Sequence, residues 1–419
     1  MTENRDARFL LGAFSLGHLA NDWPPCAIWI LAPAIALSLD LSPAELGLLI
    51  TIHSLGASIA YLPAGMLTDH VSDRGRLLML TFWWCGIGYL LASFADEFWV
   101  LATLLAIAGM GDAAWHPMAT GVLVQRFPGR RGQALGVHAM GGTLAEAVGP
   151  LTAGFLLGFL DWRTALQISV VPTLFMGVAF IWVVRRVPMS TTSRLDFGDF
   201  IHFARVWGRL KGLTVVVMIA VYHMGLMAIL SMSALFLQSE HGFSAWQAGL
   251  VFAGGLLLGS LIQPLVGRWS DTSGRKRIFI GGAILASAFS MSVSLASSEV
   301  IIVAGIVAAM AVLVGIRSGV LAFAVEYAGK REGTTLGFVF MVMDGIGSVG
   351  AVLSGIVGEW DLRNCFLLAA GFSLLSSLLA CVIPFAAHAI KAEPSKTGFH
   401  GLAGMLDSSA AVSKRNEQS

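Results

Sequence analysis

The sequence predicts an all-α membrane protein, with twelve transmembrane helices arranged as two pseudo-symmetric halves of six. Three observations support this fold class. Apolar segments long enough to cross a bilayer recur along the chain, Lys and Arg fall on alternate loops, and short motifs repeat in the same order in both halves. Only 12% of the residues are charged, about half the share in soluble domains, so the surface cannot be that of a soluble protein.

Segments of about 20 apolar residues mark the expected helices. They are too long for β-strands and lack alternation, which excludes a membrane β-barrel. The first segment is not a cleavable signal, because it is long, contains polar residues and lacks a small-residue cleavage site. The expected spans are residues 9–37, 44–67, 76–95, 98–126, 133–159, 164–184, 213–238, 245–269, 277–297, 299–328, 333–358 and 363–388.

The distribution of basic residues predicts the orientation of these spans. Of the 26 Lys and Arg residues, only Arg163 and Arg363 fall on the loops of one side, and Arg317 lies within a span. Because loops rich in Lys and Arg stay in the cytoplasm, we expect both termini to be cytoplasmic and the protein to lie in the cytoplasmic (inner) membrane.

Three pairs of matched motifs show that the chain is built from two similar halves. We expect a first half at 1–184, a cytoplasmic linker at 185–212, a second half at 213–390 and a disordered tail at 391–419. The pairs are GMLTDHVSDRGR (65–76) with GRWSDTSGRKR (267–277), GRRGQALG (129–136) with GKREGTTLG (329–337), and DWRTAL (161–166) with DLRNCF (361–366).

The loop after the eighth span resembles the signature loop of the major facilitator superfamily. A glycine would allow the tight turn, the aspartate would cap a helix, and basic residues would meet interfacial carbonyls and lipid phosphates. In the first-half copy, Ser72 and Asp73 replace the second glycine and a basic residue. The resemblance implies a conformational latch, with Glu326 paired to the loop. The matching residues are Gly267, Asp271, Gly274, Arg275 and Lys276, with Gly65, Asp69 and Arg74 in the first half.

Two further segments are similar to the fosmidomycin-resistance branch of this superfamily. They are SLGHLANDW (15–23) and GMGDAAWHPMAT (109–120). In the fifth span, Gly149, Pro150 and Gly154 match the antiporter motif of the family, whereas Ala145 and Ala153 stand where glycines are usual. The Gly-Pro step is expected to kink this helix and to allow close contact with the other half. The resemblance implies a proton-driven drug exporter.

Ionisable residues within the spans are the candidates for proton coupling, because a buried charge needs a partner or water. His18 and Asp22, and likewise Asp112 and His116, are spaced four residues apart and share a helix face. The resemblance places both pairs on cavity-lining helices. We expect Asp22 or Asp112 to carry the proton, tuned by the histidines, although static hydrogen bonds would also explain the spacing. Glu146 is either a third proton carrier or the partner of a histidine.

Arg317 is the main candidate for binding substrate, because it is the lone basic residue inside a span. It would pair with Asp112 or Asp22, hold an anionic substrate group, or form a purely structural salt bridge. Asp344 would make a polar contact between the halves. Pro117 would break its helix locally and free the carbonyl of Ala113. Three histidines without a carboxylate nearby in sequence are expected to pack between helices: His53, His138 and His223. The remaining substrate-binding candidates are Asn21, Trp115, Asp344 and His223.

The expected function is secondary transport by alternating access, with proton-coupled export of a small organic molecule or drug as the leading hypothesis. Proton-coupled import of an organic anion is the alternative, and a membrane enzyme or non-transporting scaffold is a third. No Walker loop is present, so we expect no ATP hydrolysis and no enzyme. The expected partners are a small-molecule substrate, protons and the lipid bilayer. We expect no cofactor, metal or nucleic acid, four reduced cysteines and a monomer.

Overall fold

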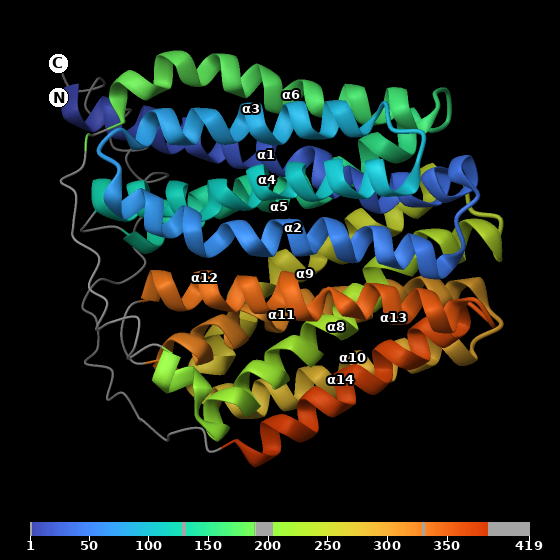
Figure 1. Ribbon diagram of the computed structural model, residues 1–419. Coiled ribbons are helices and arrows are strands. Elements are labelled where there is room, and N and C mark those ends of the chain that lie inside the picture. Colours follow the sequence, from blue (N-terminus) through green and yellow to red (C-terminus); the bar gives the residue numbers. More distant parts are fainter. Residues whose placement is uncertain (1, 128–130, 188, 190–203, 329–331, 384–419) are drawn as a thin grey trace, which may run out of the picture. The chain divides into compact units, whose positions relative to one another are not determined.

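A computed structural model describes residues 2–127, 131–187, 189, 204–328 and 332–383, and all regular structure within them is helical (Figure 1). The first six helices confirm the predicted spans. They are α1 (Thr2–Leu39), α2 (Pro43–His70), α3 (Arg74–Ala92), α4 (Phe98–Arg126), α5 (Arg131–Leu156) and α6 (Trp162–Val183). The proposed tail at 391–419 and much of the linker lie outside the described residues.

The second set of helices also confirms the predicted spans. Its members are α8 (Leu210–Ser239), α9 (Ala245–Ser273), α10 (Arg275–Leu295), α11 (Glu299–Ala328), α12 (Glu332–Val342), α13 (Val349–Gly358) and α14 (Arg363–Val382). Eleven helical segments of the described chain are long and apolar enough to cross a membrane. The remaining predicted span is α5, whose glycines and Glu146 hold down its mean hydropathy.

The helical pattern is interrupted between α12 and α13, and not in α4 as expected. We predicted a break at Pro117, but α4 continues through this residue without interruption. We predicted one continuous helix at 333–358, but a π-helical turn, Met343–Gly347, separates α12 from α13. Proline removes a single backbone hydrogen bond, which neighbouring helices can compensate. A π-turn reorients the side chains it contains and often marks a functional site.

Matched motifs of the two halves make matched contacts. The backbone N–H of Arg163 donates to Asp161 over 2.9 Å, and its guanidinium donates to the carbonyl of Ala95 over 2.9 Å. In the second copy, the N–H of Arg363 donates to Asp361 over 2.8 Å, and its guanidinium donates to a backbone carbonyl, also over 2.8 Å. The N–H and hydroxyl groups of Thr164, together with the Arg163 N–H, lower the pKa of Asp161. The two copies of this motif therefore share not only their sequence but also their hydrogen bonds.

The second helix of each half starts with the same capping device. Ser42 accepts the N–H of Glu45, and the Glu45 carboxylate accepts the N–H of Ser42, at 3.2 and 2.9 Å. Ser244 and Gln247 make the same reciprocal pair at 3.2 and 2.8 Å. Such a box satisfies N–H groups that no helical carbonyl reaches, so α2 and α9 begin at defined residues.

The two sets of helices meet where glycines remove side chains. α5 packs on α9, and α2 packs on α13. A Cβ on Gly154 would lie 2.5 Å from the carbonyl oxygen of Ala245, and one on Gly355 would lie 2.1 Å from that of Pro43. Any larger residue at either position would push two backbones apart, since a real Cβ never approaches an oxygen so closely. The expected close contact of the Gly149–Gly154 segment with the second set of helices is present.

Candidate functional site

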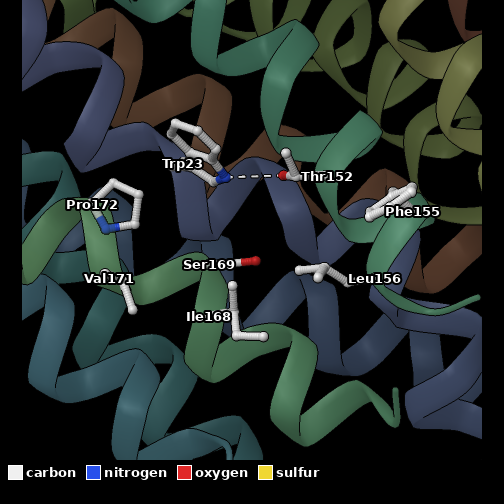
Figure 2. A pocket seen from close by; sticks show the side chains of 8 residues that line it. All are labelled: Trp23, Thr152, Phe155, Leu156, Ile168, Ser169, Val171 and Pro172. Carbon is white, nitrogen blue, oxygen red and sulfur yellow. Dashed lines mark hydrogen bonds between the residues drawn. The ribbon is translucent and has the colours of Figure 1, made fainter. Parts of the chain in front are cut away.

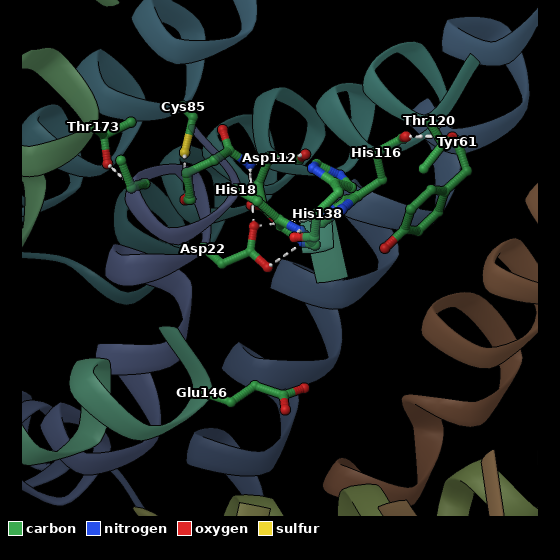
Figure 3. A network of polar contacts seen from close by, with 12 residues as sticks. His18, Asp22, Tyr61, Cys85, Asp112, His116, Thr120, His138, Glu146 and Thr173 are labelled. Carbon is green, nitrogen blue, oxygen red and sulfur yellow. Dashed lines mark hydrogen bonds and ion pairs between the residues drawn. The ribbon is translucent and has the colours of Figure 1, made fainter. Parts of the chain in front are cut away.

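Two acid–imidazole pairs lie together in the first half, contributed by α1 and α4 (Figure 3). His18 Nε2 is 3.2 Å from Asp22 Oδ2 on the next turn of α1. His116 Nε2 lies 3.8 Å from Asp22 Oδ1 and 3.9 Å from Asp112 Oδ2, which is one turn away on α4. The i, i+4 spacing thus puts each pair on one face, and packing of the two helices joins them. We call His18, Asp22, Asp112 and His116 the acid–imidazole cluster.

Hydrogen bonds to neighbouring groups orient the acid–imidazole cluster. Nδ1 of His18 lies 2.9 Å from the backbone carbonyl of His138, on α5, and the His138 ring stacks on that of His18 at 4.3 Å. Asn21 Nδ2 donates to Asp112 Oδ1 over 2.6 Å and to the Asp112 carbonyl over 3.2 Å. Asn21 is fully buried and orients Asp112 in this structure, and its expected role in binding substrate stays a prediction.

The orientation of His18 requires a proton, or another cation, between His18 and Asp22. A carbonyl oxygen only accepts, so His18 Nδ1 carries a proton and the neutral ring has its lone pair on Nε2. That lone pair would point at the carboxylate oxygen of Asp22, 3.2 Å away. Two lone pairs at this distance repel each other. A proton on either group, or another cation between them, makes the contact attractive.

A second polar group connects the two halves through the π-turn. Tyr61 of α2 donates its hydroxyl to Asp344 Oδ2 over 2.7 Å, and His223 Nε2 of α8 lies 3.5 Å from Asp344 Oδ1. The expected contact of Asp344 between the halves is therefore present. His223 is buried between helices as expected, and folding also brings it to a carboxylate 121 positions further along the sequence.

Arg317 pairs with neither of the two partners expected for it. Its guanidinium is 3.3 Å from Glu146 Oε1, and Ser260 donates to Glu146 Oε2 over 2.8 Å. The three residues come from α11, α5 and α9, so this ion pair also crosses between the halves. Glu146 was expected to carry a proton or to partner a histidine; its partners here are an arginine and a serine. The Glu146 side chain lies apart from the acid–imidazole cluster (Figure 3).

The second-half signature loop forms an ion-pair network at the junction of α9 and α10. Arg275 binds Asp271 at 2.9 Å and Glu326 at 2.6 Å, which confirms the expected pairing of Glu326. Gly274 takes a φ of 95°, as the expected tight turn requires. Lys276 Nζ donates to the carbonyls of Cys381 and Ile383 at 2.8 and 3.0 Å. The expected capping by Asp271 is wrong, because this residue lies in the last turn of α9.

The first-half copy of this loop uses different groups. Asp73, where the family has a basic residue, caps α3 by accepting the N–H of Arg76 over 3.0 Å. Arg74 is buried and donates to the side chain of Gln125 on α4 over 2.5 Å. Gly65 faces Pro117 of α4. The side chain of Asp69 lies outside the described residues. The loop therefore joins α3 to α4 through a buried arginine.

Trp115 lies in the hydrophobic core of the first half. Its side chain is fully buried and contacts Phe14, Phe82 and Phe180, with ring centroids 4.6 to 5.6 Å apart. Trp115 therefore packs the core in this structure, and its expected role in binding substrate stays a prediction. His53 is also buried, with Nε2 2.6 Å from the hydroxyl of Tyr89, which confirms its expected packing role.

The antiporter-like segment of α5 contacts helices on both of its sides. The helix continues through Pro150 to Leu156. A Cβ on Gly149 would lie 2.7 Å from Cβ of Cys26 on α1, so this glycine lets α5 approach the helix that carries His18 and Asp22. Gly154 faces the second half, as described above. This segment therefore touches the acid–imidazole helix and the partner half within two turns.

An apolar pocket of about 320 Å³ lies between α1, α5 and α6 (Figure 2). Its polar feature is the hydrogen bond from Trp23 Nε1 to Thr152 Oγ1, at 3.0 Å. None of its lining residues is charged, so the pocket offers no group for proton transfer or for binding an ion. The lining residues are Trp23, Thr152, Phe155, Leu156, Ile168, Ser169, Val171 and Pro172.

Sequence reasoning missed three contributors to these polar groups: Tyr61, Ser260 and the backbone of His138. Tyr61 and Ser260 are ordinary members of apolar spans, without a charged neighbour at helical spacing. Their partners lie 283 and 114 residues away. No local signal in the sequence could therefore have identified them.

Membrane-spanning helices in two like halves, with ionisable side chains paired inside the spans, define a multi-pass membrane protein of the secondary-transporter class. The chain belongs to the Major Facilitator Superfamily, whose family model matches residues 14–266 and 215–404. It is a transporter of that superfamily.

Two relatives are similar over most of the chain, and a third is similar over about one third of it. A fosmidomycin resistance protein of Escherichia coli (strain K12) is 24% identical over 396 residues, covering 91% of this chain and 94% of that protein. A putative metabolite transport protein of Haemophilus influenzae is 25% identical over 394 residues, covering 89% and 92%. A probable sugar efflux transporter of Helicobacter acinonychis is 35% identical over 132 residues, covering 31% and 33%.

Solved structures share the fold. A bacterial homolog of the human lysosomal transporter Spinster, in an inward-facing and unoccupied conformation, superposes with a TM-score of 0.75 at 16% identity, covering 90% of this chain and 96% of that one. A nucleoside transporter superposes with a TM-score of 0.73 at 12% identity, covering 91% and 99%. At such identities the likeness concerns the fold alone.

Proposed function

We propose that this transporter is a proton-coupled exporter, an antiporter that expels a small organic molecule by alternating access. The observation that carries the proposal is the acid–imidazole cluster, because its two carboxylates and two imidazoles meet inside the spans of α1 and α4. Such a group can hold one more or one fewer proton without losing all of its contacts. The names of the fosmidomycin resistance and sugar efflux relatives support export.

Antiport needs the proton and the substrate to favour different states of the carrier. Asp22 and Asp112 would be deprotonated when substrate is bound and would take up a proton from the outside once substrate has left. His18 and His116 would keep each carboxylate poised, because an imidazolium favours the anion and burial opposes it. Asn21 would hold Asp112 in place throughout the cycle.

Alternating access would move residues 1–184 against residues 213–390 as two domains, linked by 185–212. The α5–α9 and α2–α13 contacts are the surfaces on which they would rock. The Arg275 network would act as a latch on the side of the signature loops. The positions of the basic loops favour a cytoplasmic location for that side and for both termini, and the proposed transporter is a monomer in the inner membrane.

One observation favours a second candidate, the coupled import of a proton and an organic anion. Glu146 neutralises Arg317 at 3.3 Å. An anionic substrate would bind Arg317 when Glu146 is protonated, so anion and proton would bind together. Binding together couples their transport in the same direction, whereas competition couples it in opposite directions.

Flux in proteoliposomes tests these proposals. Sensitivity of a deletion strain to toxic small molecules and organic acids first identifies a substrate. Purified protein is then reconstituted, and substrate movement is followed under an imposed pH gradient. Export predicts that substrate moves in the direction opposite to the protons, and import predicts that substrate moves in the same direction as the protons. If the flux of every identified substrate is independent of the pH gradient, both the export and the import proposal are contradicted. If no compound is transported, the result favours a non-transporting scaffold.

A further inference from the structure

We propose that His18, Asp22 and His116 form a binding site for a divalent transition-metal ion, with Zn²⁺ the ion best matched by its ligands. Two imidazole Nε2 atoms and the carboxylate lie within 4.8 Å of one another. Two histidines and a carboxylate are a common set of protein ligands for zinc, leaving a fourth position open. The sequence shows no metal-binding spacing, because the ligands come from two helices 94 positions apart.

The Asp22 carboxylate brings both imidazoles close to the spacing that a tetrahedral ion requires. Zn–N and Zn–O bonds of about 2.0–2.1 Å place the ligand atoms of a tetrahedron about 3.3 Å apart. His18 Nε2 is 3.2 Å from one oxygen of Asp22, Oδ2, and His116 Nε2 is 3.8 Å from the other, Oδ1. To share one ion, the His116 ring would move towards the Asp22 oxygen that His18 contacts, and its side chain is 24% exposed, so it has room to do so.

Hydrogen bonds around the proposed ligands resemble those that orient the ligands in known metal sites. Metal-ligating histidines donate their other ring N–H to a carbonyl or carboxylate, and His18 Nδ1 does so to His138. This contact leaves the Nε2 lone pair facing the site. Asp112 offers a fourth ligand, since Oδ2 lies 3.9 Å from His116 Nε2 while Asn21 holds Oδ1 at 2.6 Å.

Charge also favours a divalent ion at this position. The described ion pairs of Asp22 and Asp112 involve histidine alone, and no arginine or lysine appears among them. Two carboxylates and one divalent cation sum to zero charge, which lowers the cost of keeping them inside a span. The nitrogen ligands select zinc or a neighbouring transition metal over Mg²⁺ and Ca²⁺, which prefer oxygen.

Zinc binding by the full-length protein in detergent tests the site directly. The protein is purified without a polyhistidine tag, and Zn²⁺ is titrated in competition with a chelating fluorophore. We expect one tightly bound ion per chain, and at least about tenfold weaker binding for Asp22→Asn and for His116→Gln. His223→Gln is the matched control, because this imidazole also lies beside a carboxylate, 3.5 Å away, but has no second histidine there; its binding should match the wild type.

Two further measurements keep the proposal testable if those variants fold poorly. Gly142→Ala keeps every ligand, but its Cβ would lie 2.7 Å from His18 Nε2, so zinc should bind more weakly. Co²⁺ bound to the wild type should give the absorption bands of a tetrahedral ion. Absence of a stoichiometric ion, equal binding by Asp22→Asn, or equal loss in His223→Gln would overturn the site.

The metal proposal and the transport proposal fail separately. Zinc binding is measured on detergent-solubilised protein without any gradient, so it does not depend on proton-coupled flux. Bound zinc without coupled flux would overturn the proposed function alone. Coupled flux without zinc binding would overturn the metal site alone.

Discussion

At the scale of single residues, Asp22, Asp112, Glu146 and Asp344 lie in three polar groups, each with its own partner arrangement. His18, Asp22, Asp112 and His116 stay within the first half. The Tyr61–Asp344 and Glu146–Arg317 contacts instead cross between the halves. Contacts within one half persist when the halves move, whereas crossing contacts must break. The proposed proton binding in the first group would thus be physically separable from the proposed conformational change at the other two.

Replacing Asp112 with asparagine should uncouple flux from the pH gradient. The amide oxygen still accepts the hydrogen bond from Asn21, but the amide cannot take up and release a proton as a carboxylate does. We expect gradient-driven flux to fall at least about tenfold while substrate counterflow persists. The matched control is Asp161→Asn, which makes the same change at an exposed helix cap that asparagine also fills. A variant that still concentrates substrate would show that Asp112 does not carry the proton.

Replacing Glu146 with glutamine should free Arg317, because the neutral amide no longer competes for the guanidinium. For an anionic substrate, we expect tighter binding by about tenfold and loss of the pH dependence of binding, measured by substrate titration at several pH values. Arg317→Gln should abolish binding of the anion but spare neutral substrates. Unchanged anion affinity in Glu146→Gln would assign the ion pair a structural role.

At the scale of helices, small residues and one π-turn decide how the spans meet. Gly154 and Gly355 allow backbone contact between the halves, and Met343–Gly347 interrupts the eleventh span beside Tyr61. Pro117, the helix breaker that stands out in the sequence, leaves α4 unbroken. Breaks in membrane helices therefore follow local packing more closely than they follow proline.

Replacing Gly355 with alanine should weaken the contact between α2 and α13. The added Cβ would meet the carbonyl oxygen of Pro43 at 2.1 Å, which is backbone and cannot rotate away. We expect a loss of about 1–3 kcal/mol, seen as a lower Tm in detergent. Gly371→Ala is the control, since nothing lies within 4 Å of its Cβ position, and alanine favours a helix. Equal Tm values for the two variants would contradict a tight contact at Gly355.

At the scale of the whole molecule, the matched loops predict which residues face each side of the membrane. Phe159 and Trp360 are exposed at equivalent turns, which precede the matched motifs at 161–166 and 361–366. Leu210 is exposed at the start of α8, on the proposed cytoplasmic side. In a background with Cys381 replaced by serine, we expect Phe159→Cys and Trp360→Cys to react with a membrane-impermeant thiol reagent in intact cells. Leu210→Cys should react only after permeabilisation. The reverse pattern would invert the proposed orientation.

The sequence by itself determined the class of fold, the number and approximate ends of the spans and the two-half repeat, because hydropathy and basic loops are set by the bilayer. It also determined the i, i+4 pairs His18–Asp22 and Asp112–His116, since helical spacing is local. Only the tertiary structure decided that these pairs join into one cluster, that Arg317 meets Glu146, and that Asp344 binds Tyr61 and approaches His223. Those partners lie on different helices, and side-chain packing determines which helix faces meet. Packing between distant helices leaves no regular spacing in the sequence from which the contacts could be predicted.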